Sequence, residues 1–106
     1  MERKQPSEIW NIASKDAQKL ASLMAIQLEE PMSREHIDAI ASDPDPEVRF
    51  ESEKALQELK GYGVLKEVTG DSAGTRYLLT EEFGQYVRRD QLKLKEKPKM
   101  FRYRHR

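Results

Sequence analysis

The sequence predicts an α+β fold that is mostly helical, with three helices, a two-stranded β-hairpin, a last helix and a basic tail. Apolar residues recur at helical spacing in 7–29, 34–42 and 46–60. Two strand-forming runs, 64–68 and 75–79, then flank a segment with two glycines, which is typical of a hairpin. The 106 residues are the size of one domain, which we assign to 1–88, with the tail at 89–106.

The first predicted helix, 7–29, holds more apolar residues than one buried face needs. Ser7 can cap its start, and Ser14 offers a second cap if the helix is broken there. The face that includes Trp10 and Leu20 is enough to fill the core of a small domain. The surplus face packs either under the C-terminal segment or, as we favour, against a second copy in a homodimer, through Ile9, Ile12, Leu23 and Ile26.

Two further helices follow proline-containing breaks. Beyond Pro31, Ser33 is placed to cap a short helix over 34–42. The sequence Asp-Pro-Asp-Pro at 43–46 predicts a rigid turn, after which Asp45 is placed to cap a third helix with Pro46 at its first position. That helix is expected to run to about Lys60, with an inward face formed by Val48, Ser52, Ala55, Leu56 and Leu59.

Glycines separate the third helix from the hairpin and the two strands from each other. Gly61 ends the helix, and Gly63 lets the chain turn into the first strand. Gly70 and Gly74 can supply the positive φ angles of a tight loop. Thr80 then caps a last helix, whose apolar residues are Phe83, Tyr86 and Val87.

The charge is distributed unevenly although its sum is zero. Up to Val87 there are 10 basic and 17 acidic residues, whereas from Arg88 onward there are 9 basic and 2 acidic residues. An acidic body with a basic tail suggests a polyanionic partner for the tail. Alternatively, the tail neutralises its own body or a neighbouring subunit.

Several function classes are excluded or disfavoured by what the sequence lacks. There is no cysteine, and the two histidines, His36 and His105, lie in different segments without further ligands nearby. No glycine-rich phosphate loop follows a strand, so we expect no enzyme, no cofactor and no metal site. Because no apolar run approaches about 20 residues and no signal-type segment is seen, we expect a cytoplasmic protein without membrane contact.

Three segments carry a family resemblance. Residues 33–37 (SREHI) look like the opening of the helix before the turn in a helix-turn-helix. Residues 55–65 (ALQELKGYGVL) look like the end of a recognition helix that runs into the first strand of a wing. Residues 77–84 (YLLTEEFG) resemble the Y-x-L-T-x-x-G exit from the wing, with one residue added. Over about 14–88 the chain therefore resembles the winged helix-turn-helix superfamily, and MarR- and PadR-type regulators in particular.

The resemblance implies a homodimeric DNA-binding protein that regulates transcription, with the third helix in the major groove. The outward face of that helix is expected to display Arg49, Glu53, Lys54 and Gln57. These types suit base edges, because Arg reads guanine, Gln reads adenine and Glu reads cytosine. The long Asp-Pro turn and the acidic third helix depart from the family, and four carboxylates oppose phosphates: Glu47, Glu51, Glu53 and Glu58.

A solvated or protein-binding face is the alternative for this helix, with i,i+4 pairs such as Arg49 with Glu53 and Lys54 with Glu58. Phe50 also points outward in this arrangement. It is then either a contact anchor or a sign that the helix starts later, with Phe50 tucked under the Asp-Pro turn.

The hairpin and the tail offer further cations for a nucleic acid. Lys66 and Arg76 lie on the wing, where an arginine can enter a narrow minor groove or pair instead with Glu67 or Asp71. In the tail, cations at every second residue alternate in part with aromatic rings, an arrangement suited to phosphates or exposed bases. An edge strand or a solvated tail are the other interpretations. The tail residues assigned to binding are Lys97, Lys99, Arg102 and Arg104.

The sequence therefore leaves three interpretations of function. The first is a transcriptional regulator that binds double-stranded DNA as a homodimer. The second is a winged-helix protein-interaction module in a larger assembly, for which the acidic body and the surplus apolar face supply partner surfaces. Binding of single strands or RNA through the tail alone is a third interpretation.

Overall fold

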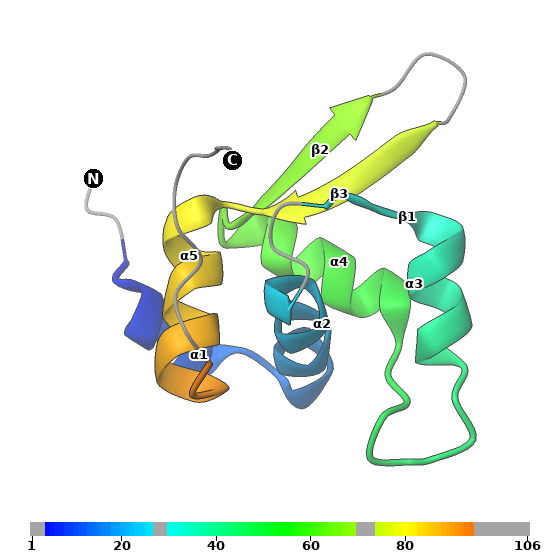
Figure 1. The fold of residues 1–106 in the computed structure, drawn as a ribbon, viewed down its shortest axis with the longest axis horizontal. Helices are drawn as coiled ribbons and strands as arrows, with labels where there is room; N and C mark the ends of the chain where they lie inside the picture. Colours follow the sequence, from blue (N-terminus) through cyan, green and yellow to red (C-terminus); the bar gives the residue numbers. More distant parts are fainter. Residues whose placement is uncertain (1–3, 27–29, 70–73, 95–106) are drawn as a thin grey trace, which may run out of the picture.

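The helices surround one central helix, and the hairpin projects beyond them (Figure 1). The computed structural model describes residues 4–26, 30–69 and 74–94. The class is α+β and mostly helical, as predicted. In chain order the elements are α1 (Pro6–Ile12), α2 (Lys15–Ile26), β1 (Met32–Ser33), α3 (Arg34–Ala41), α4 (Ser52–Gly61), β2 (Leu65–Thr69), β3 (Thr75–Leu79), α5 (Glu81–Tyr86) and the π-helical segment η1 (Val87–Gln91).

The sheet has three antiparallel strands in the order β1-β3-β2, one more than the sequence predicted. In the hairpin, Leu65 pairs with Leu79 and Thr69 pairs with Thr75. The extra strand, β1, places Met32 opposite Tyr77 on the other edge of β3. Two residues are too few for a strand pattern in the sequence, yet Met32 is only 2% exposed because it closes the core beneath the sheet.

The core is built around α2, which lies against α4 and beside α5 (Figure 1). Leu20 and Met24 of α2 belong to one hydrophobic core with Leu59 of α4 and Phe83 of α5, and all four residues are at most 2% exposed. Burial of a side chain of this size contributes about 2 kcal/mol to the free energy of unfolding.

Among the helices in the described ranges, none has the length and the apolar composition needed to cross a bilayer.

The region predicted as one helix over 7–29 forms two helices that break at Ala13 and Ser14. The carboxylate of Glu58 accepts from the Ser14 amide at 2.9 Å and from its hydroxyl at 2.6 Å. The Ser14 hydroxyl oxygen in turn accepts from the Ala17 amide at 3.2 Å, so Ser14 caps α2, the second of the two caps that we considered. Ser7 is not a cap, because α1 begins earlier, at Pro6.

The predicted start of the third helix at 46 is wrong, because α4 begins at Ser52. The carbonyl of Asp45 accepts from the amides of both Val48 and Arg49 at 2.9 Å, which closes a local turn. The Phe50 amide then donates to the carbonyl of Ala41 at 3.3 Å rather than to a carbonyl one turn earlier in a helix. Asp45 therefore caps a turn, and its side chain accepts from the Glu47 amide at 3.0 Å.

This late start explains Phe50 and corrects Val48. Phe50 is 7% exposed and belongs to the core, which confirms the interpretation that it tucks inward ahead of a shorter helix. Val48 was expected to face inward, but it lies in the loop and is 38% exposed. The inward face of α4 is otherwise as predicted, with Ala55, Leu56 and Leu59 buried.

The C-terminal helical segment runs to Gln91, past the boundary that we placed at 88. Arg88 donates to the carbonyls of Ala25 and Ile26 at 3.1 Å, and so covers the end of α2. Lys93 has a positive φ of 59°, and the amide of Leu94 returns to the carbonyl of Arg88 at 2.8 Å. The last residue of the predicted domain, Arg88, thus has a structural role, and the hydrogen-bonded backbone continues to Leu94.

We expect Glu58→Ala to lower the free energy of unfolding at neutral pH by about 2 kcal/mol, because it removes a charged acceptor from Ser14 and Tyr62. The Tyr62 hydroxyl donates to Glu58 at 2.7 Å, so Tyr62→Phe is the matched control and costs about 1 kcal/mol. Urea denaturation measures both values. Equal losses for the two variants contradict the interpretation that Glu58 holds Ser14.

The same carboxylate predicts a pH dependence. Burial acts to raise the pKa of Glu58, but hydrogen bonds from Ser14 and Tyr62 outweigh it and leave the pKa below its ordinary value of 4.5. A lowered folded-state pKa stabilises the fold above pH 4.5, and this contribution is lost as the pH falls through the folded value. The stability difference between wild type and Glu58→Ala should therefore shrink on acidification below that pH.

Candidate nucleic-acid interface

The face of α4 opposite its buried residues is polar and exposed. Glu53, Lys54 and Gln57 all lie on it, as the sequence predicted. They are held there because Ala55, Leu56 and Leu59, on the other side of the helix, are at most 3% exposed. This outward surface, Glu53, Lys54 and Gln57, is called the α4 face below.

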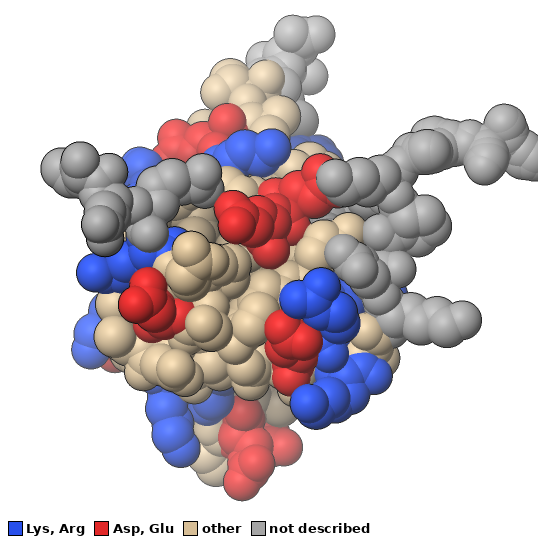
Figure 2. Space-filling view, turned by 90° about the vertical axis from the view of Figure 1, so that its left-hand side faces the viewer, with Lys and Arg blue, Asp and Glu red and all other residues tan. Residues whose placement is uncertain are grey.

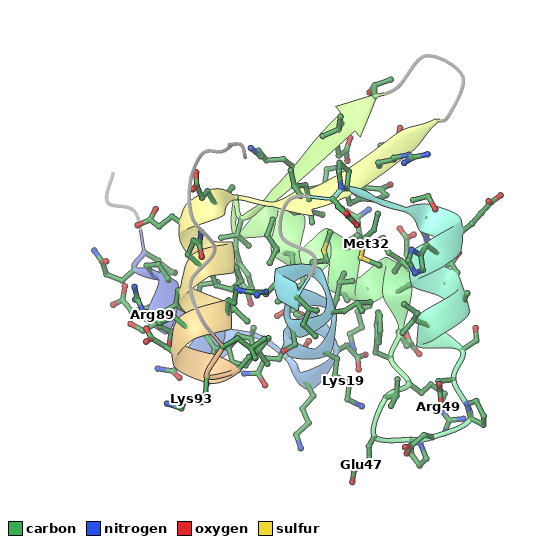
Figure 3. The ribbon with its side chains drawn as sticks, in the orientation of Figure 1. Lys19, Met32, Glu47, Arg49, Arg89 and Lys93 are labelled. Atoms are coloured by element: carbon green, nitrogen blue, oxygen red, sulfur yellow. The ribbon has the colours of Figure 1, made fainter. Side chains whose placement is uncertain are left out.

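Arg49 does not belong to the α4 face, which corrects the prediction. It precedes the helix and lies in the loop 42–51, together with Glu47 (Figure 3). This loop is at the opposite end of the molecule from the hairpin (Figures 1 and 3). The expected pair between Arg49 and Glu53 is accordingly absent, because Glu53 pairs with Arg34.

Four carboxylates were expected to repel phosphates from the third helix. In the structure, three of them lie off the α4 face or have a partner within the protein. Glu47 lies in the loop and not on α4. Glu58 turns toward Ser14 and Tyr62. Glu53 stays on the α4 face, but its Oε1 lies 2.9 Å from an Arg34 guanidinium nitrogen. Glu51, at the cap position of α4, remains exposed.

A polar network joins α3 to the start of α4. Asp38 accepts from the Ser52 hydroxyl at 2.5 Å and from Arg34 at 3.0 Å, and these two hydrogen bonds hold the pKa of Asp38 below its ordinary value. Arg34 bridges onward to Glu53. Arg34 is not among the site residues predicted from the sequence, although its i,i+4 spacing with Asp38 indicates an ion pair.

The hairpin cations face away from α4. Lys66 pairs with Leu78 and Arg76 pairs with Val68, which places both cations on the sheet face opposite Leu65 and Leu79. On the inner face, Glu67 meets Lys60 of α4 at 2.6 Å, and this contact raises the pKa of Lys60. Glu67 is therefore not the partner of Arg76, and the cations of α4 and of the hairpin are not on one continuous face.

Several predicted contacts lie outside the described residues. They involve Asp71 and the tail cations Lys97, Lys99, Arg102 and Arg104.

The predicted dimer residues separate into core and surface. Ile9 is 5% exposed and belongs to the core of the single chain, which corrects its assignment, and Leu23 packs partly against that core. Ile12 and Ile26 are 53% and 50% exposed. Figure 2 shows that the side of the molecule formed by α1 and α5 has an uncharged area bordered by charged side chains of both signs.

An apolar groove of about 440 Å³ lies between α2 and the loop 42–51. Its apolar lining comprises Trp10, Leu23, Ile40, Val48 and Phe50. Lys19 fixes the wall of the groove, because its ammonium group donates to the carbonyls of Pro46 at 3.0 Å and Arg49 at 2.9 Å. Figure 3 shows Lys19 at the same end of the molecule as Glu47 and Arg49.

No family model, curated protein or solved structure matches the chain. Over the part of the chain that the structure describes, no group of three or more His, Asp or Glu side chains is arranged to hold a metal ion.

We expect Lys19→Met to loosen the loop 42–51, since two carbonyls lose a charged donor. Amide hydrogen exchange at Val48 and Arg49 should accelerate by about tenfold. Lys15→Met is the control, because Lys15 lies on the same helix and lines the same groove. A similar acceleration in both variants contradicts the anchoring role of Lys19.

Proposed function

We propose that this chain is a winged helix-turn-helix protein that binds double-stranded DNA and regulates transcription. In this proposal α3 and α4 form the helix-turn-helix, α4 enters the major groove, and the β2–β3 hairpin is the wing. The order of α2, β1, α3, α4, β2 and β3, with β1 pairing beside the hairpin, supports it. The long loop between α3 and α4 remains a departure from the family pattern.

The observation that carries the proposal is the state of the carboxylates around α4. A helix that enters a groove must not present uncompensated negative charge to phosphates, since affinity comes mainly from cations that displace counterions. Here Glu58 is turned inward and Glu53 is paired with Arg34, which leaves Glu51 as the exposed carboxylate at the start of the helix, while Lys54 and Gln57 are exposed. The α4 face is therefore less acidic than the sequence of the helix suggests.

Phosphate contacts come from outside the α4 face in this proposal. Lys66 and Arg76 are exposed on the outer face of the hairpin, which is turned away from α4, so in this proposal they contact phosphates outside the groove that α4 enters. Neither forms an ion pair within the described residues. The basic segment from Arg88 onward adds sequence-independent attraction. Exposed Ile12 and Ile26, with the uncharged area in Figure 2, support a homodimer that contacts two half-sites about one helical turn apart.

A protein-interaction module is the second candidate, and the groove favours it. Trp10 and Phe50 line an apolar groove beside an acidic turn that contains Asp43, Asp45 and Glu47. Because Lys15 and Lys19 line the groove as well as Glu47, it suits an apolar segment flanked by charges of both signs. If no duplex binds even at low salt, this candidate replaces the first.

We expect duplex DNA to bind with an affinity that falls steeply with salt, because several phosphates are neutralised. Arg76→Ala should weaken binding to all sequences alike and reduce the log–log salt slope by about 1. Fluorescence anisotropy across a salt series measures both. Arg49→Ala is the matched control, because Arg49 lies at the end away from the hairpin and should leave the slope unchanged. An equal change in both variants contradicts the assignment of the hairpin as a wing.

We expect a homodimer in solution, with twice the 12.4 kDa mass of the chain in sedimentation equilibrium. The double change Ile12→Glu with Ile26→Glu should give a monomer, because buried, unpaired carboxylates oppose association. Val68→Glu is the control, since Val68 is 40% exposed on the hairpin and away from α1. A wild-type monomer at all concentrations refutes the dimer.

A further inference from the structure

The carboxylate of Glu53 is held from two sides on the α4 face. One oxygen lies 2.9 Å from an Arg34 guanidinium nitrogen, and the other accepts from the Gln57 amide nitrogen at 3.2 Å. Arg34 is itself fixed by Asp38 at 3.0 Å, and Asp38 also accepts from the Ser52 hydroxyl at 2.5 Å. The direction of Glu53 is therefore set by α3 as well as by its own helix.

This arrangement leaves acceptor capacity that points to solvent. A carboxylate has about four lone-pair positions on its two oxygens, and one donor on each oxygen leaves each able to accept again. The Glu53 side chain is 64% exposed, so a ligand can reach these positions. In the major groove the matching group is an exocyclic amine, and cytosine N4 is the one that a glutamate reads.

Gln57 is oriented by the same contact. Its amide nitrogen donates one hydrogen to Glu53 and has a second hydrogen available for a ligand, while its oxygen can accept a hydrogen bond. One donor and one acceptor side by side match N7 and N6 of adenine. Residues four apart lie about 6 Å apart along a helix, which is close to two base-pair steps of about 3.4 Å. The two side chains therefore reach base pairs that are one or two steps apart.

We propose that Arg34, Glu53 and Gln57 act as one reading unit that selects cytosine through Glu53 and adenine through Gln57. Arg34 is a positioning residue, which aims the carboxylate and offsets its charge beside the phosphates. The inference rests on the proposed function, because it requires α4 to enter the major groove.

The test is selection of bound duplexes from a randomised library by the full chain, followed by sequencing. Wild type should enrich cytosine and adenine one or two base pairs apart. Glu53→Gln should lose about tenfold discrimination at the cytosine position and keep most of the adenine preference, because the new amide oxygen can still accept from Gln57. Gln57→Ala should do the reverse, and it leaves the ion pairs of Arg34 in place. Arg34→Gln should weaken the cytosine preference without moving it to another base pair.

Glu51→Gln is the matched control, because it removes the same charge at the start of the same helix, where Glu51 makes no cap hydrogen bond. It should raise affinity for all sequences alike. If Glu53→Gln also changes affinity uniformly and leaves base preference intact, the reading unit is refuted while DNA binding stands. If wild type binds no duplex at low salt, the proposed function itself fails.

Discussion

Packing between α2 and α4 determines which side chains this small protein turns outward. Ala55 and Leu59 are fully buried against α2, whose Leu20 and Ala17 are equally inaccessible. Burying these positions fixes how α4 is rotated about its own axis. The opposite side of the helix, the α4 face, is therefore turned outward. The carboxylate of Glu58 on α4 also accepts two hydrogen bonds from Ser14 at the start of α2, and these bonds join the same two helices. The orientation of any site on α4 depends on this interface.

Local signals were sufficient for most of the fold. Ser33 accepts from the His36 amide at 3.1 Å and caps α3 as predicted. Gly63, in the turn from α4 to β2, and Gly74, just before β3, have positive φ angles of 79° and 77°. The start of α4 was mispredicted because Asp45 and Pro46 form a good helix-capping signal in sequence. Lys19 binds carbonyls in that segment that are 27 and 30 residues away in the sequence, contacts that no local pattern contains.

The candidate site was predictable in position but not in its charge. Helical spacing alone placed Glu53, Lys54 and Gln57 outward, and they are exposed. Whether each carboxylate is compensated depends on contacts between elements, such as Arg34 with Glu53 and Lys60 with Glu67. The prediction for Arg49 was wrong because it assumed a helix that includes residue 49. Since α4 begins at Ser52, Arg49 lies in the preceding loop and has no place on the α4 face.

Internal ion pairs have a consequence for specificity in the proposed function. Arg34 and Lys60 are each half exposed or nearly so, and exposed ion pairs of this kind contribute only about 0–1 kcal/mol to stability. Their effect on DNA affinity is different, because a cation that is already paired with a carboxylate attracts phosphates less strongly than an unpaired cation does. The sequence-independent part of the DNA affinity then falls. Base contacts from the α4 face still discriminate between base pairs to the same extent. If α4 binds DNA as proposed, its internally paired charges therefore lower total affinity and raise the ratio of specific to non-specific binding.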